Sequence, residues 1–213
     1  MSVLTIASSK GGPGKSTIAM VLTGVLAAEG FRVIAFDADP TQAFSRWATN
    51  AYEGLPFQTF AEADETRLAH LISQKADDAD MVIVDTAGFG NRAAAVAMTS
   101  ADAILVPALS GEADVTEAEK TIRLARGLAR AARREIPALI LLNKQRRTQL
   151  ARHAANEIAN ADLPRLAASL SDLVAFGELS YSGRIPASGP AAAEVSALIA
   201  ELRSLGWIPK QTT

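Results

Sequence analysis

Cysteine is absent from the 213 residues of this chain, and aromatic residues make up only 5% of it. Without cysteine the chain has no disulfide bond, no cysteine-ligated zinc or iron–sulfur cluster and no thiol nucleophile. These exclusions favour a reducing compartment, the cytoplasm. The formal net charge is −2, so no global basic field attracts nucleic acid, and any surface that binds nucleic acid must be a local patch.

Long hydrophobic runs are also missing from the sequence. No stretch approaches 18 uncharged apolar residues, and the N-terminal "MSVLTIASSKGG" has no basic leader before a long apolar core. We therefore expect neither export nor stable membrane insertion. Hydrophobic residues make up 49% and charged residues 21%, which is ordinary for a globular protein, and the length suggests a single domain over residues 1–213.

Short apolar runs alternate with longer helical patterns along the chain. Runs that are apolar almost throughout lie near residues 3–8, 32–37, 81–85, 103–108 and 138–143. Helices are predicted near 15–29, 41–50, 64–75, 90–100, 113–134 and 191–205, with a further edge strand at 57–60. Continuous apolar strands are typical of sheets covered on both sides. The order therefore predicts an α/β fold whose mostly parallel sheet is flanked by helices on both faces.

The stretch "SSKGGPGKST" at residues 8–17 lies where the first strand would turn into the first helix. In that context glycines let backbone N–H groups point inward, and the positive end of the helix dipole lies beside them. The sequence therefore predicts a P-loop. Lys15 would reach the β- and γ-phosphates of a nucleotide, Ser16 would bind Mg²⁺ and Thr17 would contact the α-phosphate. The predicted nucleotide-binding residues of the loop are Gly11, Gly12, Pro13, Gly14, Lys15, Ser16 and Thr17.

Acidic residues end two other predicted strands. "FDADP" places Asp37 and Asp39 after the second strand, and "MVIVD" places Asp85 at the end of the fourth. Ligands of open α/β sheets bind outside the carboxyl ends of the strands. Asp85 has the position of a Walker B aspartate that would hold Mg²⁺. Asp37 would support the magnesium shell or the loop, although two aspartates at this place are also typical of a helix cap.

Two residues after the fourth strand are predicted to form a switch. Thr86 and Gly88 would belong to a flexible segment beside the γ-phosphate, where hydrolysis is converted into motion. Four strand ends that carry compatible groups favour a nucleotide site more strongly than the P-loop alone.

The loop departs from the general pattern G-x-x-x-x-G-K-[ST], because Ser9 stands where the first glycine should be. Residues 10–16, "KGGPGKS", instead resemble the deviant form K-G-G-x-G-K-[ST] of the ParA/MinD family of ATPases. The resemblance covers about residues 1–145, and it is greatest to short ParA proteins without an N-terminal helix-turn-helix. It implies ATP and Mg²⁺ as cofactors and a homodimer in which Lys10 touches the partner's nucleotide. It also makes Asp39 the residue that positions or activates the attacking water.

The resemblance weakens beyond residue 145, where a helical part is expected over residues 146–213. Many relatives have an R-x-A-[FY] element, whereas "LVAFGELSYSG" has Leu173 where the arginine would fall. An asparagine at the end of the sixth strand faces the adenine in some relatives, which makes Asn143 a candidate base contact. Gln42 is displaced by one residue from the family's glutamine and has no assigned role.

The resemblance implies a function in DNA partition. ParA-like proteins bind DNA without sequence preference after ATP has dimerised them, and a ParB-like adaptor or centromere-binding protein stimulates slow hydrolysis. We therefore expect a cytoplasmic ATPase that is nucleoid-associated when bound to ATP and that segregates plasmid or chromosomal DNA. Phosphate contacts of this kind need charge, not sequence readout.

Two basic groups are candidates for the DNA-binding surface. One consists of Arg123, Arg126, Arg130, Arg133 and Arg134 on a predicted helix, where a solvated amphipathic face explains the charges equally well. The other consists of Lys144, Arg146, Arg147 and Arg152, and it is preferred because it lies nearer the predicted dimer edge.

Several alternatives stay open. A protein cargo could replace the DNA cargo. A MinD-like membrane-cycling ATPase would need a basic amphipathic last helix, whereas the helix at 191–205 is expected to pack into the core. A metabolic synthase of the dethiobiotin or cobyrinate type shares the fold, but Lys10 speaks against it. A small-molecule kinase would need an arginine-rich lid, and the missing cysteines exclude a nitrogenase iron protein.

Overall fold

Seven parallel strands form one sheet in the computed structural model, which describes residues 2–88, 91–146, 158 and 161–210. The strand order is β3-β2-β4-β1-β5-β6-β7, and every pairing is parallel. The strands are β1 (Ser2–Ile6), β2 (Val33–Ala38), β3 (Gln58–Ala61), β4 (Met81–Thr86), β5 (Ala103–Ala108), β6 (Ala138–Gln145) and β7 (Arg165–Ser171). The five apolar runs and the edge strand at 57–60 are thus strands, as predicted.

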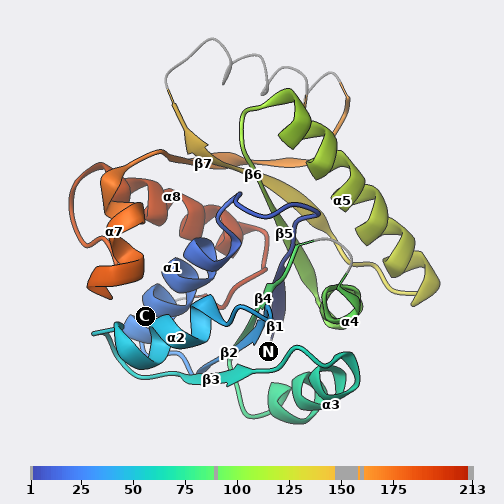
Figure 1. The fold of residues 1–213 in the computed structure, drawn as a ribbon, viewed down its shortest axis with the longest axis horizontal. Helices are drawn as coiled ribbons and strands as arrows, with labels where there is room; N and C mark the ends of the chain where they lie inside the picture. Colours follow the sequence, from blue (N-terminus) through green and yellow to red (C-terminus); the bar gives the residue numbers. More distant parts are fainter. Residues whose placement is uncertain (1, 89–90, 147–157, 159–160, 211–213) are drawn as a thin grey trace.

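Helices cover both faces of the sheet (Figure 1). They are α1 (Lys15–Ala28), α2 (Ala43–Asn50), α3 (Glu65–Ala76), α4 (Arg92–Ser100), α5 (Glu112–Ala131), α7 (Val174–Ser182) and α8 (Gly189–Ser204). Helices α1, α2, α7 and α8 pack on one face, and α3, α4 and α5 pack on the other. This arrangement is the predicted α/β architecture of a P-loop NTPase.

Burial explains why the strands read as continuous apolar runs. Every residue of β2, β4 and β5 is buried, because helices cover both sides of these strands. Fully burying one large side chain, such as Phe36 or Leu105, stabilises the fold by about 1.5–3 kcal/mol. The edge strand β3 has no fully buried residue, which fits its place at the end of the sheet.

Strand β7 corrects the expectation that residues 146–213 are helical. It pairs in parallel with β6 and adds a seventh strand to the sheet. The sequence of β7, "RLAASLS", is rich in small residues, and only Leu166 and Leu170 are buried. Two buried positions four residues apart match a helix as well as a strand, so the local pattern does not reveal this edge strand.

Glutamates of α8 supply hydrogen bonds that keep β7 in place. The Glu201 carboxylate accepts the backbone N–H groups of Ala167 and Ala168 at 2.7 Å, and Glu194 accepts that of Ser171 at 2.7 Å. These carboxylates satisfy donors that an edge strand would otherwise expose. The buried face of α8 packs in the same core, as expected of the last helix.

Helix α5 ends earlier than predicted. It stops at Ala131, and Arg133 has a φ of 52°, which ends the helical path. The guanidinium of Arg134 turns back to pair with Asp102 at 2.9 Å. Arg133 and Arg134 therefore do not extend the arginine face of the helix. In the part of the chain that the structure describes, no helix has both the length and the apolar character needed to cross a membrane.

Candidate nucleotide-binding site

The predicted P-loop joins β1, the central strand of the sheet, to α1. Gly12 and Gly14 have φ values of 96° and 93°, a left-handed conformation that glycine adopts without steric cost. Gly14 is the N-cap of α1, and no side chain caps the first N–H groups of this helix. These donors and the positive end of the helix dipole thus form a cradle for an anion.

Lys15 lies inside this cradle. Its side chain is buried, with 7% of the residue exposed, and the Nζ atom donates a hydrogen bond to the carbonyl oxygen of Lys10 at 3.1 Å. Burial lowers the pKa of Lys15, while the nearby carboxylates of Asp85 and Asp39 oppose this shift. A desolvated ammonium held over the loop is suited to bind the β- and γ-phosphates of a nucleotide.

Asp85 has the buried carboxylate with the fewest partners in the site. Only 1% of the residue is exposed, and neither carboxylate oxygen has a partner with full hydrogen-bond geometry among the described residues, although the Ser16 hydroxyl lies close to the carboxylate. Burial raises its pKa to about 7, and Asp37 adds to the shift, whereas the Ser16 hydroxyl and the Lys15 ammonium oppose it. A buried carboxylate without partners is costly unless a cation joins it.

This orphaned carboxylate fits the predicted magnesium site. Mg²⁺ usually binds one or two protein oxygens together with substrate phosphates, and Asp85 beside Ser16 offers such a set. The described residues contain no group of three or more acidic, histidine or cysteine side chains that could hold a metal ion alone. The residues therefore fit an ion that arrives with the nucleotide, where it would neutralise phosphate charge.

Asp37 is level with Asp85 in the β2–β4 register and is completely buried. Its two oxygens accept backbone N–H groups, from Asp39 at 3.1 Å and from Ser45 at 2.8 Å. Burial raises the pKa of Asp37, and these hydrogen bonds partly offset the rise. Of its two expected roles, these contacts match support of the β2–α2 loop, and a direct contact with magnesium stays a prediction.

Asp39 lies at the entrance of the same loop. It is half-buried, and its carboxylate accepts the backbone N–H group of Thr41 at 2.8 Å. This contact is a local turn and not the helix cap of the alternative interpretation, because α2 begins at Ala43 and Gln42 is its N-cap. It nevertheless lies near enough to Lys15 to affect the pKa of that lysine. Asp39 thus lies near Lys15 of the cradle while it shapes its own turn.

Asn143 contacts the loop from behind. Its buried Nδ2 atom donates to the carbonyl oxygen of Pro13 at 2.7 Å, and a Cβ atom on Gly14 would lie 2.3 Å from it. No sequence pattern predicts this positioning role. Asn143 also lines a cavity of about 420 Å³ together with Thr17 and Leu173. Leu173, Val174 and Phe176 give one wall of this cavity an apolar lining.

An open cleft of about 750 Å³ lies in front of the loop, with Gly11, Pro40 and Gly88 among its lining residues. A Cβ atom on Gly88 would lie 3.4 Å from the Gly11 nitrogen, so this part of the predicted switch rests against the loop. Thr86 differs from the expectation of a flexible residue. It is the last residue of β4, and its buried hydroxyl donates to the Ile6 carbonyl at 2.9 Å.

Ser9 and Lys10 face α5, a helix that the local sequence motifs do not connect with the site. The Ser9 hydroxyl donates to the Glu117 carboxylate at 2.7 Å, and the Ser9 backbone N–H donates to the Thr121 hydroxyl at 3.0 Å. The Lys10 ammonium pairs with Asp114 at 2.7 Å. The three partners stand at positions i, i+3 and i+7 of α5, a polar stripe that was the available sequence signal.

The basic group preferred as the DNA-binding surface lies only partly within the described residues. Lys144 is exposed, with a φ of 50°, and Arg146 pairs with Asp172 at 2.6 Å. Arg147 and Arg152 lie outside the described residues. Lys144 also lines the cavity behind the loop, so this group adjoins the site.

Comparison with known proteins places the chain among ParA-like proteins. The family model described as VirC1 protein matches residues 1–204. The chain is 28% identical over 194 residues to protein VirC1 of Rhizobium rhizogenes, a match that covers 87% of this chain and 83% of that protein. It is 34% identical over 124 residues to protein ParA of Rhizobium radiobacter, which covers 58% of this chain and 56% of that protein.

The fold is also that of a solved ATP complex. McdA of Cyanothece bound to ATP superposes with a TM-score of 0.82 at 15% identity, covering 100% of this chain and 99% of that chain. At this identity the likeness concerns the fold alone. Together with the family match over nearly the whole length, it means that the chain belongs to the VirC1 protein family, within the ParA/MinD group of P-loop ATPases.

Proposed function

We propose that this protein is an ATP-dependent dimerising ATPase of the ParA type that positions or segregates DNA. The observation that carries the proposal is the buried, unpartnered carboxylate of Asp85 beside the buried ammonium of Lys15 in a glycine-rich loop. Both charges are desolvated in advance, so a triphosphate with its Mg²⁺ ion would complete them. Membership of a family that contains ParA supports partition as the process.

Each residue has a role in the proposed cycle. Lys15 and the loop N–H groups hold the triphosphate, and Ser16 with Asp85 holds the Mg²⁺ ion. Two subunits then close over the open cleft, where Lys10 of each subunit reaches the nucleotide of the other. The closed dimer binds DNA without sequence preference on the nucleoid. A ParB-like adaptor stimulates hydrolysis, in which Asp39 orients the attacking water and after which the dimer opens.

Replacing Asp39 with alanine is expected to leave a dimer that ATP locks closed. The side chain makes one hydrogen bond, to the backbone of Thr41, so its loss removes the water-positioning carboxylate at little structural cost. Analytical ultracentrifugation should show a monomer without nucleotide and a long-lived dimer with ATP and Mg²⁺. The rate of phosphate release should fall by about a hundredfold, the lower range for a general base.

Asp64→Ala provides the matched control, because Asp64 also accepts one backbone N–H group, that of Arg67 at 2.9 Å, but it does so as the N-cap of α3. This control should hydrolyse ATP and dissociate like the unaltered protein. If the Asp39 variant is a monomer both with and without ATP, the proposed switch is wrong.

The DNA-binding surface is tested by charge reversal. Because Lys144 lines the cavity behind the loop, we expect DNA binding at the adjoining group to depend on ATP. Reversing Arg146 and Arg147 to glutamate should weaken ATP-dependent retention of DNA about tenfold in 0.1 M salt. Filter binding to DNA fragments of unrelated sequence measures the loss and its salt dependence.

Reversal of Arg126 and Arg130 on α5 is the parallel experiment. Both residues are exposed, and neither has an ion-pair partner among the described residues. Unchanged retention in this variant supports the surface at 144–147, whereas a selective loss would move the surface to α5. Full retention by both variants would speak for a protein cargo in place of DNA.

A further inference from the structure

One face of α5 holds the beginning of the P-loop. Ser9 is fixed by Glu117 and Thr121, and this anchor directs the next side chain, Lys10, along α5 towards Asp114. Because serine replaces the first glycine of the general P-loop pattern, the loop gains a hydroxyl that glycine cannot provide. The departure from the pattern therefore has a structural consequence: it fastens the loop to α5 just before Lys10.

The Lys10–Asp114 ion pair is partly shielded from water. The nitrogen–oxygen distance is 2.7 Å, and the side chains of Lys10 and Asp114 are 45% and 15% exposed. Among the described residues, Asp114 is the one carboxylate paired with Lys10, since Glu117 is engaged by Ser9 and by Lys120 at 2.7 Å. Lys10 is thus held by a single carboxylate of its own chain.

We propose that Asp114 is a positioning residue that holds Lys10 within its own subunit until a nucleotide-loaded partner competes for it. This inference rests on the proposed use of Lys10 across the dimer. In the proposed dimer, the Lys10 ammonium leaves Asp114 when it turns to a phosphate of the other subunit. Closing the dimer therefore breaks two Lys10–Asp114 pairs, one in each subunit. Asp114 then sets the protein concentration at which the ATP-bound dimer forms.

Replacing Asp114 with asparagine tests this restraint with almost unchanged side-chain volume. An ion pair of this exposure is worth about twofold to fivefold in an equilibrium constant, so the loss of two pairs should lower the dimer dissociation constant about fourfold to twenty-five-fold. Sedimentation in a non-hydrolysable ATP analogue with Mg²⁺ measures this constant. The affinity of the monomer for a fluorescent ATP analogue should stay the same, since Asp114 contacts Lys10 and none of the residues 11–17 that would hold the nucleotide. The free energy of unfolding should fall by no more than the worth of one partly exposed ion pair, about twofold to fivefold in the unfolding equilibrium.

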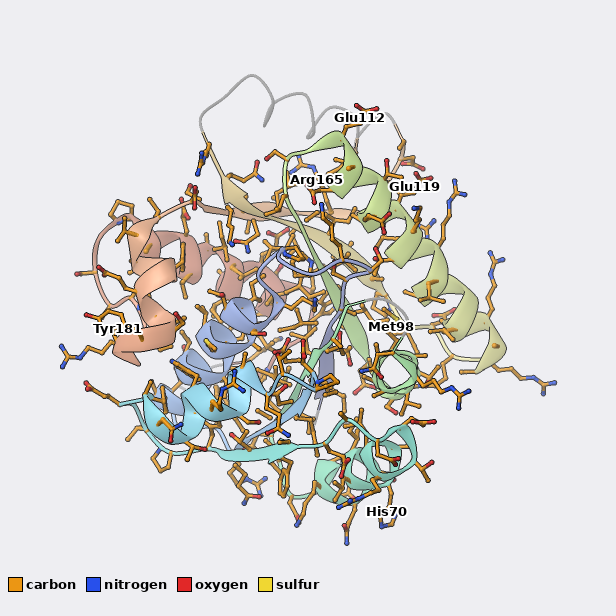
Figure 2. The ribbon with its side chains drawn as sticks, in the orientation of Figure 1. His70, Met98, Glu112, Glu119, Arg165 and Tyr181 are labelled. Atoms are coloured by element: carbon orange, nitrogen blue, oxygen red, sulfur yellow. The ribbon has the colours of Figure 1, made fainter. Side chains whose placement is uncertain are left out.

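Glu119→Gln is the matched control, because it removes the same charge from the same helix. Glu119 lies farther along α5, pairs with Arg123 at 2.5 Å and does not contact the P-loop (Figure 2). Its dimer constant should equal that of the unaltered protein. If Glu119→Gln also tightens the dimer, the effect of Asp114→Asn comes from the lost negative charge on α5 and not from the lost contact with Lys10.

A double-mutant cycle with Lys10→Ala separates this inference from the proposed function. Lys10→Ala should abolish the dimer, and adding Asp114→Asn should not restore it. If Lys10→Ala dimerises normally, the proposed role of Lys10 across the interface is wrong. If Lys10→Ala abolishes the dimer but Asp114→Asn leaves the constant unchanged or weakens the dimer, the proposed function stands and the restraint by Asp114 is wrong.

Discussion

Lys15→Ala is expected to abolish measurable ATP binding. Removing one partner of a buried charge contact costs about 3 kcal/mol, which is roughly a 150-fold loss of affinity. The loss should be this large because the Lys15 ammonium is already buried, so it gives its full charge to the phosphates without further desolvation. Titration with a fluorescent ATP analogue in Mg²⁺ measures the affinity.

The Lys15 experiment needs a control for fold and for charge. Lys75→Ala removes the same charge from α3, where Lys75 pairs with Asp78 at 3.8 Å, and should bind ATP normally. The Lys15 variant should remain folded by circular dichroism, because its side chain makes one hydrogen bond, to the Lys10 carbonyl. Binding within threefold of the unaltered protein would show that the nucleotide does not sit in this loop.

Much of the fold and of the site was predictable because parallel strands leave local signals. A strand covered on both sides must be apolar throughout, as β4 is from Met81 to Val84, and the first polar residue then marks its carboxyl end. In this way the sequence alone predicts that Asp37, Asp85 and Asn143 lie at strand ends. The carboxyl ends of parallel strands meet at one edge, so local patterns specified a site built from distant segments.

Contacts between side chains of distant segments were not predictable in the same way. The pairs Lys10–Asp114 and Asn143–Pro13 are separated by 104 and 130 residues in the sequence. They depend on the rotation of α5 about its axis and on the register of β6, neither of which a local pattern determines. Strand β7 was missed for a related reason, since its stability comes from pairing with β6 and from the glutamates of α8.

Asp85→Asn is expected to remove most of the pH dependence of stability in the protein without nucleotide or Mg²⁺. The pKa of Asp85 is about 7 in the folded chain and about 3.9 in the unfolded chain, so between these values the folded state binds more protons. Stability should therefore fall as the pH rises from 4 to 7. The total loss is about 4 kcal/mol, at about 1.4 kcal/mol for each of the roughly three units of difference in pKa. Urea unfolding in EDTA at several pH values measures it.

The asparagine variant should be more stable than the unaltered protein at pH 8 and nearly equal to it at pH 4, because an amide carries no charge to bury. Some slope should remain, since burial also raises the pKa of Asp37. Asp78→Asn, which removes an exposed carboxylate, should keep the full pH dependence. With Mg²⁺ and ATP at pH 8, the unaltered protein should become more stable than the variant, because the asparagine does not supply the carboxylate that would bind the ion. Equal stability of the variant and the unaltered protein from pH 4 to 8 would mean that Asp85 carries no unpaired charge in the folded chain.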